Sequence, residues 1–300
     1  MAARSTESSE MALNALRVDF TSRVNGRDYR LFVSVPSTPP PPGGFSVLYL
    51  IDGNLHFGIA VDTARIQSRW PDVRDPVVVG IGYPTANVAE ALTLRNIDLT
   101  SPIAPEHLAS GWIADMGSKA QDFGRVDDYL RMVQEDVKPR VAELADIDAA
   151  DQTLVGHSLG GLTTLRALFL HPSSFQQYVA ISPSIWWDRC AILAHEAAFA
   201  DLARAGSVVA RVMLSVGADE STARHVPGMA VSEDAMRAMT EECRMVPNTV
   251  ELGARLAALG APGLDVSTVV HAGDDHNMVP PAGIARGVMY TMRRSVATAR

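Results

Sequence analysis

The stretch Thr153-Leu154-Val155-Gly156-His157-Ser158-Leu159-Gly160-Gly161 decides how this chain folds. It begins as an apolar run of strand length, it ends in the pattern Gly-x-Ser-x-Gly, and residues 162–170 continue with the apolar spacing of a helix. This order is typical of a nucleophile elbow, in which a serine occupies a strained turn between a buried strand and a helix. Gly156 and Gly160 stand where a β-carbon would collide with the neighbouring strand and helix. The stretch therefore predicts that the Ser158 hydroxyl is raised toward solvent.

A carboxylate that could assist this serine follows a later strand. A serine hydroxyl is a weak nucleophile unless an imidazole takes its proton and a carboxylate orients that imidazole. In proteins with this elbow, the acid and then the histidine come after the serine in the chain. Residues 210–216 predict a buried strand that leads into Asp219 and Glu220. Because neighbouring side chains on an extended loop point in different directions, only one of the two can serve; we predict Glu220, with Asp219 as the alternative.

Two histidines follow the last predicted strand, residues 264–270. His271 stands close to the strand end, whereas His276 lies farther along a polar loop that can reach back over the elbow. We therefore predict His276 as the general base.

Outside the elbow, the apolar pattern alternates between strands and helices. Residues 17–22 and 28–35 predict an antiparallel hairpin around Asn25-Gly26. The later predicted strands are 46–51, 76–82, 152–156, 177–181, 210–216 and 264–270, and the predicted helices are 124–143, 159–170, 188–205, 231–245, 250–259 and 281–298. This alternation predicts an α/β fold with a mostly parallel central sheet, helices on both faces and an antiparallel hairpin at the N-terminus. All predicted catalytic residues then fall at the carboxyl ends of the strands.

Two backbone N–H groups are predicted to stabilise a developing oxyanion. Leu159, directly after the serine, supplies the first, and Gly53 or Asn54, after strand 46–51, supplies the second. A simple polar turn at 52–54 is the alternative.

Residues 84–123 contain a long irregular region, and such loops usually line or cover a site. Arg95 is the candidate substrate ligand there, and a structural pair with Asp98 is the alternative. Trp186 and Trp187 follow strand 177–181, and packing is the favoured role for this pair. One of them can still line the edge of the cleft, and Trp187 is the candidate for that position.

Six blocks of the chain, spread over most of its length, resemble the enterochelin (siderophore) esterase-like family of the α/β-hydrolase superfamily. They lie at 47–54, 78–84, 95–100, 156–162, 182–187 and 276–280. The resemblance implies catalysis by Ser158 and His276, and its Gly-x-x-Glu pattern falls on Glu220. It also implies that Arg95 helps to hold an anionic catecholate substrate. Asn54, His157 and Trp187 complete the predicted substrate-binding set.

The motifs and the resemblance together predict a serine esterase that cleaves carboxylic esters through an acyl-enzyme, including the ester or trilactone bonds of a catecholate siderophore. The same scaffold also serves acyltransferases and general short-chain carboxylesterases, so these remain alternatives. A non-catalytic binding protein is a further alternative. No metal and no organic cofactor is expected.

Composition sets the remaining expectations. With 300 residues, of which 47% are hydrophobic and 20% charged, the chain suits one α/β-hydrolase domain over 13–300, with 84–123 as a site-lining insertion and 1–12 as a disordered tail. The net charge of −8 argues against a nucleic acid or an anionic membrane as partner. Cys190 and Cys243 form no disulfide or metal motif. Residues 1–16 lack the cationic start and apolar run of a signal peptide, which predicts a cytoplasmic protein. The sequence does not distinguish a monomer from a homo-oligomer.

Overall fold

The computed structural model describes residues 10–11, 15–109, 119–229 and 231–294. The predicted tail at 1–12 lies outside these residues except for Glu10–Met11, which form the short strand β1. The predicted insertion at 84–123 is described except for 110–118.

The described residues form a nine-stranded sheet in the order β1-β2-β3-β5-β4-β6-β7-β8-β9. Its longer strands are β2 (Ala15–Thr21), β3 (Asp28–Ser34), β4 (Phe45–Ile51), β5 (Val77–Gly82), β6 (Ile147–His157), β7 (Gln177–Ile181), β8 (Ala210–Gly217) and β9 (Leu264–His271). Pairing is antiparallel from β1 to β5 and parallel from β5 to β9. The carboxyl ends of the parallel strands therefore meet at one edge of the sheet. The predicted hairpin and the predicted parallel strands are confirmed.

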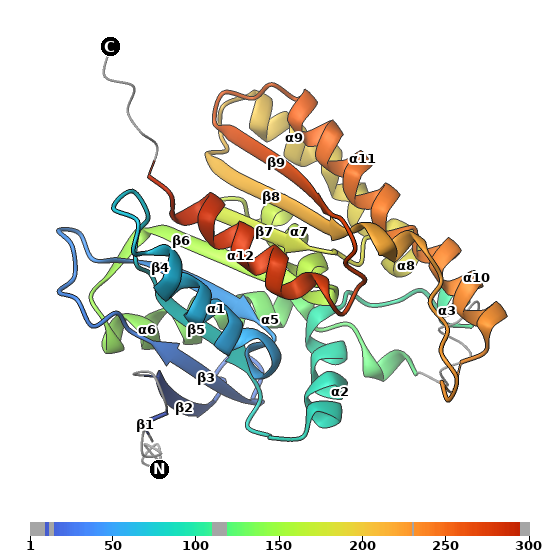
Figure 1. The fold of residues 1–300 in the computed structure, drawn as a ribbon, viewed down its shortest axis with the longest axis horizontal. Helices are drawn as coiled ribbons and strands as arrows, with labels where there is room; N and C mark the ends of the chain where they lie inside the picture. Colours follow the sequence, from blue (N-terminus) through green and yellow to red (C-terminus); the bar gives the residue numbers. More distant parts are fainter. Residues whose placement is uncertain (1–9, 12–14, 110–118, 230, 295–300) are drawn as a thin grey trace.

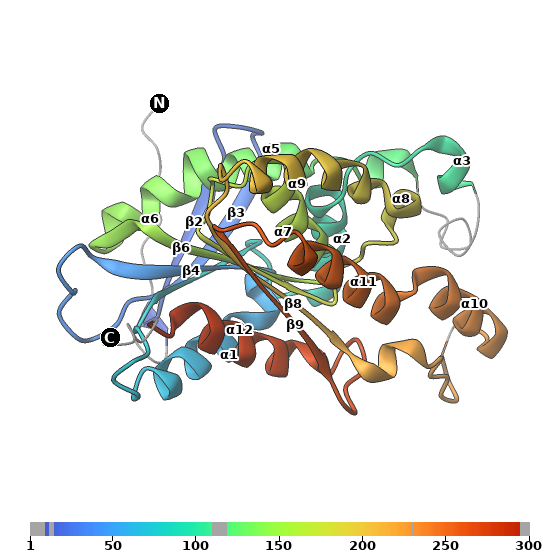
Figure 2. The ribbon, with the colours of Figure 1, turned by 90° about the horizontal axis from the view of Figure 1, so that it is seen from above.

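Helices cover both faces of this sheet (Figures 1 and 2). On one face lie α1 (Gly53–Gln67) and α12 (Val279–Met292). The other face carries α5 (Val126–Met132), the π-helical turn η2 (Val133–Val137), α6 (Lys138–Leu144), α7 (Leu159–Leu170), α9 (Glu196–Arg204) and α11 (Met245–Ala258). Near the carboxyl ends of the strands lie α2 (Val88–Leu99), α3 (Pro105–Leu108), η1 (Ala120–Asp122), α8 (Trp187–Cys190), η3 (Ala191–His195), η4 (Ala218–Ser221) and α10 (Glu233–Cys243).

The central strands are buried on both faces, which explains their nearly continuous apolar sequences. Every residue of β4 and β5 is buried. One core cluster joins these strands to α5, α7 and α9, and a second joins them to α1 and α12. This three-layer arrangement is the predicted α/β-hydrolase fold.

The structure differs from the predicted helices at several places. Helix α1 was not predicted, although a parallel crossover between β4 and β5 requires an element of this kind. The predicted helix 188–205 is wrong in its first part, because Asp188, Arg189 and Cys190 have φ between 48° and 63° and interrupt a regular helix. The predicted helix 281–298 begins two residues earlier and ends at Met292, after which Arg293 is extended and pairs with Val73.

Candidate active site

Ser158 occupies the turn between β6 and α7 with φ 60° and ψ −119°, a conformation that residues with a β-carbon seldom adopt. The backbone on both sides is fixed by hydrogen bonds. The Ser158 N–H donates to the Ile181 carbonyl at 2.9 Å, and the Ser158 carbonyl accepts from Leu162 and Ser184 at 3.0 and 3.1 Å. This is the geometry of a nucleophile elbow, and it leaves the serine half-buried at the carboxyl edge of the sheet.

The glycines of the elbow permit close contact between strand and helix. A β-carbon on Gly156 would lie 2.1 Å from the Gly160 carbonyl oxygen, and one on Gly160 would lie 3.1 Å from Ile51 Cγ2. The predicted collision is therefore present at Gly156, whereas at Gly160 the contact is only tight. Gly161 adds a third close approach, since its β-carbon would lie 2.9 Å from the Ile181 carbonyl oxygen.

Glu220 lies directly after β8, in η4, and its carboxylate has a donor on each oxygen. Oε2 accepts from His276 Nδ1 at 2.7 Å, and Oε1 accepts from the Gly217 N–H at 2.8 Å and from Ser182 Oγ. The Glu220 side chain is 1% exposed, whereas Asp219 is exposed. The structure thus brings Glu220 to the histidine and leaves the alternative acid, Asp219, at the surface.

His276 lies in the loop between β9 and α12. The Asp275 carboxylate shapes this loop by accepting the N–H groups of Asn277 and Met278 at 2.9 and 3.0 Å. Gly217 lets the loop approach β8, because a β-carbon there would lie 2.2 Å from the Asp274 carbonyl oxygen. The alternative histidine, His271, is the last residue of β9 and stays paired with Gly217 in the sheet.

His276 belongs to a row of three imidazole rings. Its ring centroid lies 4.6 Å from that of His157, which in turn lies 5.6 Å from that of His56. Burial holds the pKa of His157 well below its ordinary 6.5, and the neighbouring His276 and His56 lower this pKa further. Burial also lowers the pKa of His56, an effect that outweighs the opposing charge of Asp52. At neutral pH the His157 and His56 rings of this row are therefore uncharged.

The turn between β4 and α1 lies beside the elbow, because β4 and β6 are neighbouring parallel strands. Gly53 and Leu159 are the first residues of α1 and α7, and the first N–H groups of a helix lack an acceptor within the helix. Asp52 has a φ of 61°, in the left-handed region, and this conformation reverses the backbone between β4 and α1. A β-carbon on Gly53 would lie 2.6 Å from the Gly80 carbonyl carbon, so glycine is needed for the turn to pack against β5.

Arg95 differs from both of its predicted roles. Its Nε and Nη2 donate to the two carboxylate oxygens of Asp52 at 2.8 Å each, and Nη2 also reaches the His157 carbonyl at 3.3 Å. It is 8% exposed, and the residues that line the cavity over Ser158 do not include it. The alternative partner, Asp98, is instead paired with Arg27 at 3.0 Å. Arg95 thus stabilises the β4–α1 turn through its ion pair with Asp52. No local pattern in the sequence could indicate this partner.

Three other predicted binding residues are used in packing. The Asn54 side chain accepts the Tyr83 N–H at 2.8 Å and donates to the Tyr83 and Thr85 carbonyls. Trp187 is 4% exposed and donates from Nε1 to the Ser101 carbonyl at 3.2 Å. His157 lies between two other histidines and is not among the cavity residues. The tryptophan that does edge the cleft is Trp186.

A cavity of about 640 Å³ lies over Ser158 and His276. Besides these two residues it is lined by Ser184, Trp186, Asp219, Glu220, Thr222, Arg224, Val226, Met229, Met236, Met239, Thr240, Cys243, Met245, Asp275 and Asn277. The Ser158 and Ser184 hydroxyl oxygens are 3.4 Å apart at its base. Met236 and Met239 of α10 contribute to this lining, a position that depends on tertiary packing and that the sequence does not reveal.

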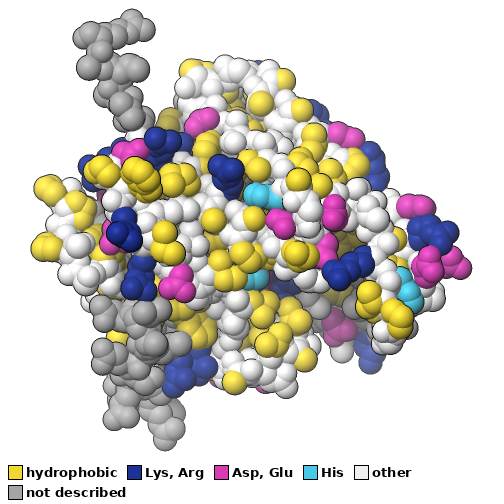
Figure 3. Space-filling model, viewed as in Figure 1, with side chains coloured by type: hydrophobic (Ala, Val, Ile, Leu, Met, Phe, Trp, Pro, Cys, Tyr) yellow, Lys and Arg dark blue, Asp and Glu magenta, His cyan; other side chains and the backbone are white. Residues whose placement is uncertain are grey.

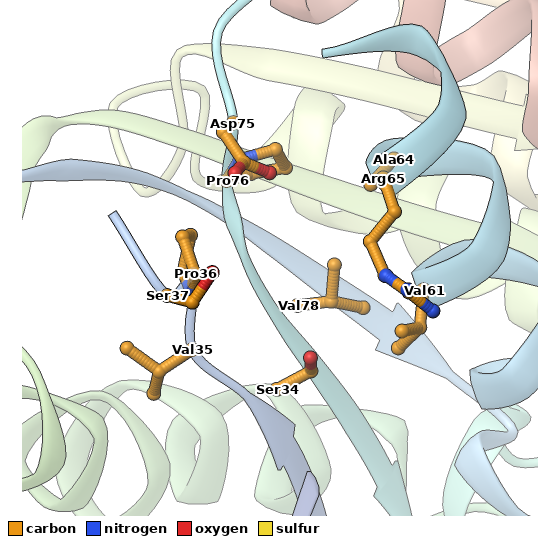
Figure 4. Close-up of a pocket in the computed structure, with 10 residues that line it drawn as sticks. All are labelled: Ser34, Val35, Pro36, Ser37, Val61, Ala64, Arg65, Asp75, Pro76 and Val78. Atoms are coloured by element: carbon orange, nitrogen blue, oxygen red, sulfur yellow. The ribbon is translucent and has the colours of Figure 1, made fainter. Parts of the chain in front are cut away.

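A second cavity, of about 280 Å³, lies near the amino end of β5, between β3 and α1 (Figure 4). Its charged residues are Arg65 and Asp75. Burial raises the pKa of the Asp75 carboxyl group. The figure shows serine, proline and valine side chains around it, with no histidine among them. This cavity therefore lacks the base that serine chemistry requires.

The described residues contain no group of three His, Cys, Asp or Glu side chains placed to hold a metal ion. Within the same ranges, no helix has the length and apolarity needed to span a bilayer.

Comparison with known proteins places the chain in a family. Residues 22–248 match the family described as "Putative esterase". The chain is 34% identical to the ferri-bacillibactin esterase BesA of Bacillus subtilis, over 91% of this chain and 87% of that protein. It is 33% identical to the siderophore enterobactin esterase of Emericella nidulans, over 87% of this chain and 88% of that protein. The solved structure of the siderophore hydrolase EstA from Aspergillus nidulans superposes with a TM-score of 0.79 at 29% identity, covering 97% of this chain and 98% of that one.

The family match covers most of the chain, and the relatives align over nearly their whole lengths. The elbow and the buried carboxylate–histidine pair lie inside the fold that the solved structure shares. The chain belongs to the "Putative esterase" family of α/β-hydrolases and is a carboxylic ester hydrolase.

Proposed function

We propose that this enzyme hydrolyses the ester bonds of a siderophore, with Ser158 as the nucleophile, His276 as the general base and Glu220 as the acid that orients it. These three roles are supported above all by the 2.7 Å hydrogen bond between Glu220 and His276 Nδ1, which lies in the same cavity as the strained Ser158. The siderophore assignment is supported by the names of the relatives, which act on ferri-bacillibactin and enterobactin.

The proposed reaction proceeds in two halves. Glu220 accepts only, so the hydrogen-bonded Nδ1 carries a proton and the other ring nitrogen of His276 can take the Ser158 proton. Ser158 Oγ then attacks the ester carbon, and the N–H groups of Leu159 and Gly53 stabilise the oxyanion. His276 returns the proton to the leaving alcohol, and an ester to Ser158 remains. Water, activated by the same histidine, breaks this ester and releases the acid.

We also propose that residues 13–300 act as one domain and that 84–123 borders the site. The carboxylate of Asp188, two residues after Trp186 in the chain, pairs with His107 and accepts the Ala104 N–H at 3.2 Å. Replacement of Asp188 by alanine should therefore change KM for large esters more than for acetate, and equal changes would contradict a bordering role. A cytoplasmic location stays a prediction, which cell fractionation would test.

The test of the main proposal is hydrolysis of enterobactin and bacillibactin, iron-free and ferric, beside p-nitrophenyl acetate, with products identified by mass. Ser158→Ala should lower turnover of all accepted esters by about 10⁴-fold or more. Ser207→Ala, at an exposed serine before β8, is the matched control and should match wild type. Turnover of p-nitrophenyl acetate alone would reject the siderophore assignment, and transfer to an added alcohol in preference to water would indicate an acyltransferase.

A further inference from the structure

The wall of the cavity that comes from α10 and the start of α11 is rich in methionine. Met236 and Met239 come from α10, Met245 begins α11, and Met229 precedes α10. Four of the twelve methionines of the chain thus line this one cavity, so the wall is a concentrated feature rather than scattered filler. Methionine is unbranched and polarisable, adapts to irregular shapes and makes favourable contacts with aromatic rings.

Trp186 adds an aromatic surface to the same wall. Trp186 is half-buried, and its ring packs against that of the buried Trp187, with 5.9 Å between the ring centroids. A flat ring supported in this way offers a stacking surface at little cost in side-chain entropy. Wall and tryptophan together form a surface suited to a flat apolar group.

The charges around the cavity do not favour an anion. Arg224 is the cation among its described lining residues, and its Nη1 is paired with the Asp275 carboxylate at 2.7 Å. Glu220 is turned inward to His276, and among the described residues Asp219 forms no ion pair. Figure 3 shows acidic, basic and hydrophobic side chains around a hollow to the right of centre on this face. A negatively charged group that entered here would meet unneutralised carboxylate and no unpaired cation in the described lining.

Ser158 and His276 line the same cavity as the methionines. An ester whose carbonyl carbon reaches Ser158 Oγ can therefore place one of its substituents along this wall. The volume of about 640 Å³ lies within the usual range for small-molecule sites.

We propose that the wall formed by Trp186, Met236, Met239 and Met245 is the specificity site of the enzyme, and that it selects esters with a bulky, uncharged aromatic group. The proposal rests on the proposed function only in that Ser158 must be the nucleophile. It concerns the group beside the ester and makes no use of iron.

Size selection is tested with two ester series. In the first, p-nitrophenyl acetate, benzoate and 2-naphthoate vary the acyl group; in the second, ethyl, benzyl and 2-naphthylmethyl acetate vary the alcohol. Met239→Ala and Met236→Ala should each lower kcat/KM for the largest ester of at least one series by about tenfold and change that for the smallest less than about twofold. Both methionines are half-buried, so the variants should fold, which a melting curve checks. Leu202→Ala, on α9 and 45% exposed, is the matched control and should change neither value. Equal effects on large and small esters in both series, or no effect, would overturn the proposal.

Charge selection is tested with a pair of esters of nearly equal shape. The p-nitrophenyl esters of 4-carbamoylbenzoic acid and of terephthalic acid differ by a carboxamide against a carboxylate. Wild type should prefer the carboxamide by about tenfold in kcat/KM, and Asp219→Asn should narrow this preference. Equal rates, or faster hydrolysis of the carboxylate, would overturn the proposal.

These results are separable from failure of the proposed function. If Ser158→Ala abolishes turnover of the simple esters but the methionine variants show no selectivity, the specificity site is rejected and the nucleophile stands. If enterobactin and bacillibactin are not cleaved but the simple esters show the predicted size and charge selection, the siderophore assignment is rejected and the specificity site stands.

Discussion

At the scale of single residues, Glu220 shows how a buried carboxylate is made tolerable. Burial of a charge costs several kcal/mol unless its oxygens find donors. Here the Gly217 N–H, the Ser182 hydroxyl and the His276 ring supply three, two to one oxygen and one to the other. Because two of these donors come from β8 and the turn after β7, the carboxylate is fixed before substrate binds, and so is the imidazole that it orients.

This arrangement predicts different effects for two adjacent carboxylates. Glu220→Gln should lower kcat about 10³- to 10⁴-fold, because the amide can neither hold the Nδ1–H tautomer reliably nor stabilise the imidazolium. Asp219→Asn, one residue earlier, should leave kcat for an uncharged ester such as p-nitrophenyl acetate within about twofold, since its side chain is exposed. The measurement is p-nitrophenyl acetate hydrolysis by the two variants beside wild type. Similar losses in both variants would contradict the assignment of Glu220.

At the scale of elements, the site depends on how closely β6 and α7 approach. Gly156→Ala should destabilise the protein by about 1–3 kcal/mol, because the added methyl would lie 2.1 Å from the Gly160 carbonyl oxygen and backbone must move. Gly58→Ala is the same change within α1, where a β-carbon meets nothing within 4 Å, and it should stabilise by about 0.5–1 kcal/mol. Urea denaturation of both variants measures the difference, and two effects of the same sign would contradict this account.

The sequence predicted well the elements that are determined locally. The elbow and the start and end of α7 follow from apolar spacing and glycine positions within about twenty residues, whereas the predicted strand 152–156 covers only the second half of β6. Where a side chain finds its partner on a distant element, local pattern was insufficient. Arg95 could not be assigned to Asp52, which precedes it by 43 residues, and the choice between Trp186 and Trp187 depended on the irregular backbone after β7.

At the scale of the whole molecule, two histidines lie at the carboxyl edge of the sheet, and neither forms an ion pair within the part of the chain that the structure describes. His157 and His56 lie in the row behind His276, and their pKa values are lowered mainly by burial. The fold therefore keeps both rings neutral below the pH at which an exposed imidazole would bind a proton. A protein built in this way should lose stability on mild acidification.

The sign and window of this effect follow from the direction of the pKa shifts. Above the ordinary value of 6.5 the histidines are neutral in both folded and unfolded chains and contribute no pH dependence. As pH falls below 6.5, the unfolded chain binds protons that the folded chain does not, so the free energy of unfolding falls by up to about 1.4 kcal/mol per pH unit for each histidine. His157→Phe and His56→Phe should each make the plot of unfolding free energy against pH less steep between about pH 5 and 6.5. His225→Phe, at an exposed histidine, is the matched control and should keep the wild-type slope. Urea denaturation at several pH values measures these slopes, and parallel plots for wild type and the two buried-site variants would show that the imidazoles are protonated in the folded protein.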